Sequence, residues 1–214
     1  MSQYVLEFAG LMAVFAVVIV APGADFAVVV RQCVVHGRRA AIATSVGIGS
    51  SLLFHIGYTI VGLGLIVSQS LLALAVLKWA GAAYLVYLGI RSWREAPPLP
   101  TDVATDDHSH PGGASLLRSF ALGFATNALN PKPVLFFLSL FSALVSHHTP
   151  VAVQAVYGLL MAAALIAWFV AVSFFFTAPS VRARFVAWGR WINRITGAAF
   201  VGLGIRLAVS RAAD

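Results

Sequence analysis

Residues 4–30 read YVLEFAGLMAVFAVVIVAPGADFAVVV, an apolar run whose only charged residues are Glu7 and Asp25. The run is longer than the roughly 20 apolar residues that carry a helix across the hydrocarbon core of a bilayer. Near its end stand Pro22, which removes a backbone donor and clashes with the preceding turn, and Gly23, which loosens the backbone further. The stretch therefore predicts a membrane-spanning helix that is broken at Pro22.

The rest of the chain extends this prediction to a multi-pass membrane protein. Five more apolar runs follow, at 40–67, 71–90, 116–145, 151–177 and 188–209. The chain of 214 residues is 60% hydrophobic and only 10% charged, whereas a soluble domain is about half apolar and a quarter charged. We expect an all-α integral membrane protein with six transmembrane helices in contact with lipid, of which the first and fourth are broken by proline.

The basic residues predict the orientation of the spans. A net charge of +7 would suggest nucleic-acid binding in a soluble protein, but here most of the basic residues gather in three loops. These residues are Arg31, Arg38, Arg39, Arg91, Arg94, Arg118, Arg182, Arg184, Arg190 and Arg194. The positive-inside rule places the three loops in the cytoplasm, and we expect both termini on the opposite, periplasmic face. We expect no nucleic-acid partner.

A weak internal repeat divides the chain into halves. GAAYLVYLGIR at 81–91 is followed, about half the chain length later, by GAAFVGLGIR at 197–206. Pro22 and Pro131 break the first and fourth runs with a similar separation. Because each half holds three spans, an odd number, the second half enters the membrane from the opposite side. The pattern predicts two inverted repeats, an architecture found in many secondary transporters.

The boundary between the halves is the only long polar stretch. Residues 92–114 hold prolines, glycines, three aspartates and two histidines. We expect a flexible cytoplasmic linker between a first repeat at 1–91 and a second repeat at 115–214. Its histidines and aspartates lack a scaffold that would fix a divalent metal, and we predict no metal site.

The broken spans carry the polar residues. Asp25 follows the first break, and an intramembrane carboxylate costs about 3 kcal/mol on insertion scales and usually faces a cavity or a partner. The fourth run reads NALNPKP at 127–133, in which Pro131 is flanked by Asn127, Asn130 and Lys132. An unwound turn in lipid is tolerated only beside protein or water. Both breaks are therefore expected to border a polar cavity.

Asp25 and Lys132 occupy equivalent zones of the two halves, and we expect them to approach one another. With the backbone freed at Pro22, Gly23 and Pro131, they would offer an anionic and a cationic site, which complements a small zwitterion. A carboxylate whose proton affinity depends on its surroundings can exchange a proton for a substrate. The hypothesis is proton antiport that needs no cofactor beyond the proton gradient. The alternative is a structural ion pair that only fixes helix packing.

Two motifs resemble those of a known family. Pro22-Gly23-Ala24-Asp25 in the first run and Asn130-Pro131-Lys132 in the fourth, in a six-span chain of this length, resemble the LysE/RhtB family of amino-acid exporters. The family's usual first motif is Pro-Gly-Pro, and Ala24 stands here at the second proline. The resemblance implies proton-driven efflux of amino acids or their derivatives across the inner membrane. It does not name the substrate, because members differ widely and some relatives handle metal ions.

His55 lies within the second run. As an intramembrane titratable group, His55 either relays protons or is a hydrogen-bonded packing residue.

Two other functions are alternatives to amino-acid export. A divalent-metal exporter would need several acidic or imidazole ligands in the spans, where only Asp25 and His55 are available. An intramembrane enzyme would need a nucleophile and base or a metal triad, and no motif of that kind occurs, so we expect a protein that is not an enzyme. Whether it forms a homo-oligomer is not decided by the sequence.

Overall fold

The computed structural model describes residues 2–69, 71–94, 115–146, 148–176 and 179–209. These residues form eight helices and no strand. The helices are α1 (Ser2–Val20), α2 (Ala24–His36), α3 (Arg38–Gln69), α4 (Leu71–Arg94), α5 (Leu116–Ala128), α6 (Pro131–Leu144), α7 (Val151–Phe175) and α8 (Pro179–Val209).

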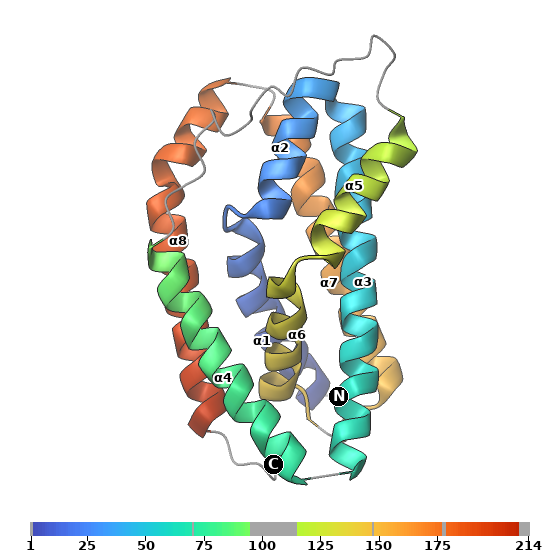
Figure 1. Cartoon of the computed structure of the whole chain (residues 1–214), viewed down its shortest axis with the longest axis vertical. Helices are drawn as coiled ribbons and strands as arrows, with labels where there is room; N and C mark the ends of the chain where they lie inside the picture. The colour runs from blue at the N-terminus through green and yellow to red at the C-terminus, as the bar shows by residue number, and fades with distance from the viewer. Residues whose placement is uncertain (1, 70, 95–114, 147, 177–178, 210–214) are drawn as a thin grey trace.

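The helices run along the long axis of the molecule (Figure 1). α2 continues beyond α1, and α6 continues beyond α5, so that each pair crosses the molecule end to end (Figure 1). α1, α2, α4 and α7 run in one direction, whereas α3, α5, α6 and α8 run in the other (Figure 1). As a result, α1 begins and α8 ends at the same end of the molecule, opposite the α2–α3 turn.

The surface of the bundle is apolar as well as its core. Four stretches are long and apolar enough to cross a membrane among the described residues: Gln3–Val20, Arg38–Gly62, Val151–Phe175 and Ala187–Val209. Large apolar side chains are exposed along the helices, among them Leu72 on α4, Phe175 on α7 and Trp188 on α8. A helix that is apolar on every face can contact lipid with one face and pack against other helices with the other.

Two of the predicted runs are each divided between two helices. In the first run, α1 ends at Val20 and α2 begins at Ala24, with the buried Pro22 in the interval. Gly23 is the N-cap of α2 and has no side chain with which to accept a hydrogen bond from the helix. In the fourth run, Asn130 is the N-cap of α6 and its Oδ1 accepts from the Lys132 backbone N at 3.0 Å. Pro131 follows at the first helical position, where a missing N–H leaves no partner unsatisfied.

Small residues let neighbouring helices approach closely. A Cβ atom on Gly47 of α3 would collide with the Phe120 carbonyl of α5, and one on Gly123 of α5 would collide with the Thr44 carbonyl of α3. The Thr44 hydroxyl donates across the same contact to the Ser119 carbonyl at 3.0 Å. Such backbone approach is the usual way in which membrane helices gain packing energy.

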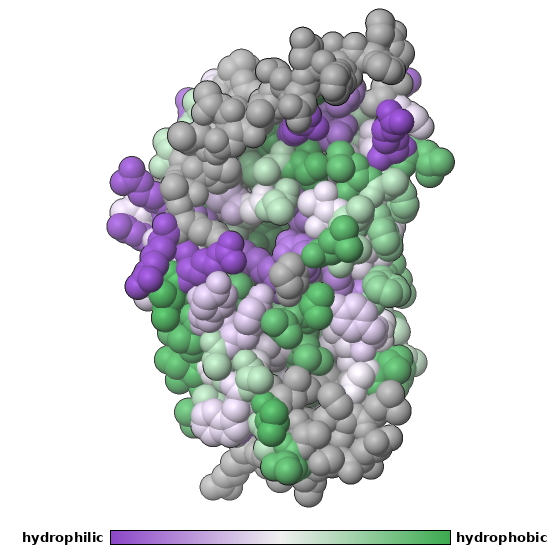
Figure 2. Space-filling view, viewed as in Figure 1, coloured by the Kyte–Doolittle hydropathy of each residue, from purple (hydrophilic) through white to green (hydrophobic). Residues whose placement is uncertain are grey.

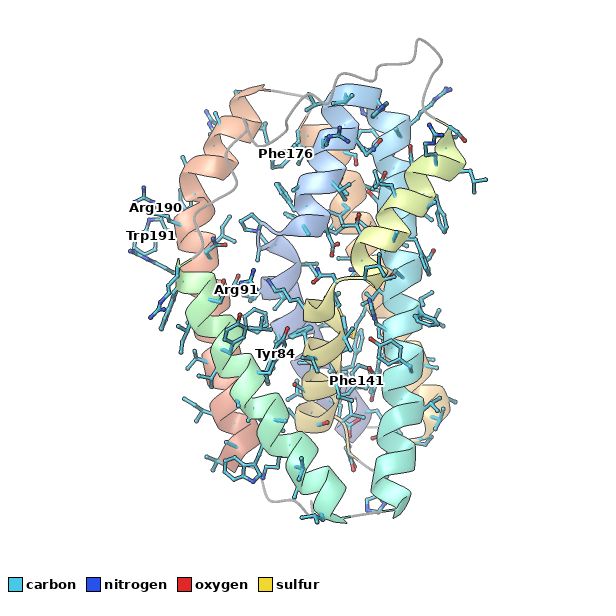
Figure 3. All side chains as sticks on the ribbon, viewed as in Figure 1. Tyr84, Arg91, Phe141, Phe176, Arg190 and Trp191 are labelled. Carbon is cyan, nitrogen blue, oxygen red and sulfur yellow. The ribbon has the colours of Figure 1, made fainter. Side chains whose placement is uncertain are left out.

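The boundaries around the linker differ from those predicted. α4 continues through Arg94 rather than ending before residue 92, because its last turn packs on α8. Ser92 Oγ donates to the Asn193 carbonyl at 3.0 Å, and Trp93 Nε1 donates to the Arg194 carbonyl at 2.9 Å. Arg91 therefore lies on a helix and not in a loop, and it projects from α4 toward the middle of the molecule (Figure 3). Residues 95–114, with the aspartates and histidines of the predicted linker, lie outside the described part of the chain.

Glu7 is a buried carboxylate that ties α1 to the turn before α7. Its oxygens accept from Gln3 Nε2 at 3.1 Å, from Ser146 N at 3.3 Å and from Tyr157 Oη at 3.2 Å. Thr149 Oγ1 lies 3.0 and 2.9 Å from the two oxygens. The charge is thus satisfied by donors that come mostly from residues far away in the sequence.

Replacing Glu7 by alanine is expected to destabilise the protein by roughly 3 kcal/mol, because buried donors lose their acceptor. Thermal unfolding in detergent measures the effect as a lower midpoint. Gln3→Ala is the matched control, since it removes one donor at an exposed position and should change the midpoint little. Equal midpoints for the two variants would contradict a role for Glu7 in holding these segments together.

Candidate functional site

A cavity of about 90 Å³ lies where the two helix breaks face one another. The polar residues along its wall are Asp25, Asn127, Asn130 and Lys132, and most of the remaining wall is apolar. Figure 2 shows a band of hydrophilic residues across the face that it displays, at the height of the breaks and beside a hollow. The cavity is therefore a polar site inside an otherwise apolar bundle.

Asp25 is the acid of this cavity. It stands in the first turn of α2, where the positive end of the helix dipole stabilises a negative charge. Asn127 Nδ2 donates to Asp25 Oδ2 at 2.8 Å. Within the described part of the chain, Asp25 Oδ1 and Asn127 Oδ1 are both buried and accept no hydrogen bond. Two buried acceptors without donors, on two residues of one cavity wall, favour a ligand that is rich in N–H groups.

Lys132 is the base of the cavity, at the start of α6. Pro131 and Pro133 have no N–H, and the backbone N of Lys132 is already taken by Asn130. This helix end therefore offers few backbone amides to an anion, and its positive charge comes from the Lys132 side chain. Lys132 Nζ lies 5.7 Å from the centre of the Phe200 ring. Lys132 lines the same cavity as Asp25.

His55 is buried on α3 beside the site and is not among the described residues that line the cavity. Its Nε2 lies 3.1 Å from the backbone carbonyl oxygen of Asn127. Because a carbonyl oxygen can only accept a hydrogen bond, Nε2 carries the proton. Its Nδ1 lies 2.6 Å from Tyr58 Oη. These contacts are those of a packing histidine, and they hold the end of α5, which carries Asn127. A proton-relay role remains a prediction.

The structure brings together most of the residues predicted from the sequence. Five of them line the cavity: Gly23, Asp25, Asn127, Asn130 and Lys132. Pro22 is buried in the interval before α2, and Pro131 is the first residue of α6. Asp25 and Lys132 thus come from opposite halves of the chain and line the same cavity.

The sequence interpretation missed the aromatic part of the wall. Five of the fifteen phenylalanines are among the described residues that line the cavity: Phe15, Phe26, Phe136, Phe137 and Phe169. Phe136 lies one turn after Lys132 on the same face of α6, and this spacing could have identified it. For Phe169 on α7 no local signal exists, because every face of that helix is apolar.

The chain matches a family model and several known efflux proteins. Residues 16–211 match the family described as LysE type translocator. The threonine efflux protein of Escherichia coli K12 is 30% identical over 199 residues, which cover 92% of this chain and 95% of the relative. The threonine efflux protein of Salmonella typhimurium is 30% identical over 198 residues, with the same coverage. The homoserine/homoserine lactone efflux protein of Salmonella typhimurium is 38% identical over 129 residues, 60% of each chain.

No solved structure matches the chain at a significant level. The family match covers both helix breaks and every polar residue of the cavity wall. The chain belongs to the LysE type translocator family and is a membrane transporter.

Proposed function

We propose that this transporter exports amino acids or their derivatives across the bacterial inner membrane in exchange for protons. The observation that carries the proposal is the placement of one acid and one base on the wall of a single cavity between two helix breaks. The names of the relatives, which are threonine and homoserine efflux proteins, support the same class of substrate.

The substrate would bind as a zwitterion. Its ammonium group has three N–H donors, which would satisfy Asp25 Oδ1 and Asn127 Oδ1, the acceptors that lack a donor. Buried unpaired acceptors cost about 1–3 kcal/mol each, and a ligand that pairs them recovers that free energy. The carboxylate would face Lys132, whose ammonium provides the opposite charge.

Proton coupling would follow from competition at Asp25. The carboxylate is occupied either by the substrate ammonium or by a proton, and the two exclude one another. After the substrate leaves on the periplasmic side, a proton would neutralise Asp25 for the return step. Substrate binding on the cytoplasmic side would then displace that proton. The cycle needs the proton gradient and no cofactor.

The helix arrangement supports two inverted repeats, α1 to α4 and α5 to α8, that cross the membrane six times. The helices of one half run opposite to their counterparts in the other (Figure 1). In the contact between α4 and α8, a Cβ on Gly89 or Gly197 would lie 2.7 Å from the other's carbonyl oxygen. A Cβ on Gly204 would lie 2.9 Å from the Ala82 carbonyl oxygen. Exchanging the halves turns Gly89 and Gly197 into Gly204 and Gly81, and the second contact, with Ala82, lies one residue from that position, which supports a pseudo-two-fold relation between the halves.

The charge distribution supports the orientation. Arg38 and Arg39 are exposed at the α2–α3 turn, opposite the end where α1 begins and α8 ends. The positive-inside rule would place this turn in the cytoplasm and both termini in the periplasm.

Transport in proteoliposomes tests the proposal directly. Vesicles loaded with single amino acids are diluted into substrate-free buffer, and a pH-sensitive dye reports proton movement opposite to the amino acid. We expect at least one amino acid to move protons, and a protonophore to abolish the signal. If no amino acid in the full panel moves protons or exchanges with its labelled form, the proposed function is wrong.

A further inference from the structure

We propose that the substrate of this protein is a neutral amino acid with an apolar side chain, such as valine or leucine. The relatives are named for threonine and homoserine, whose side chains carry a hydroxyl group. The inference rests on the proposed function, because it assigns the ammonium and carboxylate groups of the substrate to Asp25 and Lys132. It also assigns a position in the cavity to the side chain of the substrate.

Four phenylalanines form a cluster against the cavity. Phe15 of α1 and Phe137 of α6 have ring centres 5.8 Å apart, and Phe136 lies 5.1 Å from Phe137 and 5.5 Å from Phe200 of α8. None of the four rings is more than 3% exposed. Phe15, Phe136 and Phe137 reach the cavity wall. Because Lys132 Nζ lies above the Phe200 ring, a carboxylate held by Lys132 places the rest of the substrate next to this cluster.

The cluster consists of phenylalanine rings, which offer no conventional hydrogen-bond partner to a hydroxyl group. Two hydroxyl groups on its helices donate their protons to backbone carbonyls. Ser139 Oγ donates to the Leu135 carbonyl at 2.7 Å, and Thr196 Oγ1 donates to the Val17 carbonyl at 3.3 Å. Leu52 and Leu165 add aliphatic side chains to the same cavity wall. A substrate hydroxyl directed here would lose its hydrogen bonds to water without replacement.

A second charge on the substrate would also lack a partner. Asp25 is the one acid, and Lys132 the one base, among the described residues of the wall. Both are engaged by the amino-acid backbone groups of the substrate. A basic or acidic side chain would therefore be buried unpaired, which is costlier than burying a hydroxyl. An apolar side chain placed against the phenylalanine cluster brings no polar group of the substrate that would need a partner there.

Valine and threonine provide the sharpest comparison, because they have the same shape and differ by a methyl group in place of a hydroxyl. In proteoliposomes, each labelled amino acid is exchanged against itself across a range of concentrations. We expect half-maximal exchange of valine at a concentration about 10- to 100-fold lower than that of threonine, the discrimination that apolar pockets reach for such a pair. If threonine or homoserine exchanges at the lower concentration, the inference is overturned while the proposed function stands. If no amino acid exchanges, the proposed function itself fails.

A pair of variants tests whether the cluster receives the side chain. Phe137→Ala widens the cavity and should raise the exchange of phenylalanine relative to valine about 10-fold. Phe141→Ala is the matched control, because Phe141 is equally buried one turn farther along α6 (Figure 3) and is not among the described residues of the wall. The ratio of two substrates does not depend on the amount of protein. An unchanged ratio in Phe137→Ala, or the same change in Phe141→Ala, would reject the assignment. Phe137→Leu replaces Phe137→Ala if the latter does not insert.

Discussion

Asp25→Asn is expected to abolish proton-driven export while the protein still folds and inserts. The asparagine side chain has the size of aspartate and can keep a hydrogen bond with Asn127 Nδ2, which lies 2.8 Å from Asp25 Oδ2 in the wild type. It cannot take up a proton or balance the charge of a substrate ammonium group. In proteoliposomes with an imposed pH gradient, accumulation of substrate should fall to the level of protein-free vesicles.

Glu7→Gln is the matched control for this result. It makes the same chemical change at another buried carboxylate, on α1, which is not among the described residues of the cavity wall. Once its lower stability is accounted for by the amount of folded protein, Glu7→Gln should still couple transport to protons. Accumulation at the wild-type rate by Asp25→Asn would show that Asp25 is not the coupling residue, whatever the substrate.

Lys132→Ala is expected to weaken substrate binding, with a smaller effect on the maximal rate. A hydrogen bond to a charged group contributes about 1.5–3 kcal/mol, so its loss should raise the apparent KM about 10- to 100-fold. The initial rate of exchange, measured over a range of substrate concentrations, separates KM from the maximal rate. Lys132→Arg keeps the positive charge at the start of α6 and should recover part of the affinity.

The other lysine of the chain, Lys78 on α4, provides the control for a general charge effect. Lys78→Ala removes the same charge away from the cavity and should leave the KM unchanged. An unchanged KM in Lys132→Ala, or an equal increase in both variants, would exclude Lys132 from the substrate site.

The polar half of the site could be predicted from the sequence because its signals are local. A proline followed by glycine interrupts a helix wherever it lies, and Asp25 is carried to the first turn of the next helix by its position after Pro22 and Gly23. In the same way, Asn130 and Pro131 make a helix start that brings Lys132 with it. Charged residues in apolar runs are rare and costly, which singles them out without any knowledge of their neighbours.

The apolar half of the site was decided only by the tertiary structure. In a soluble protein, a polar face would have marked which side of each helix points outward. In lipid both sides are apolar, so periodicity cannot distinguish Phe137, which lines the cavity, from Leu135, which is exposed on the same helix. The partners of Glu7 and the contact of His55 with the Asn127 carbonyl also join distant segments. The sequence by itself determined where the helices break and which charged residues lie at the breaks. Helix packing determined which phenylalanine rings line the cavity.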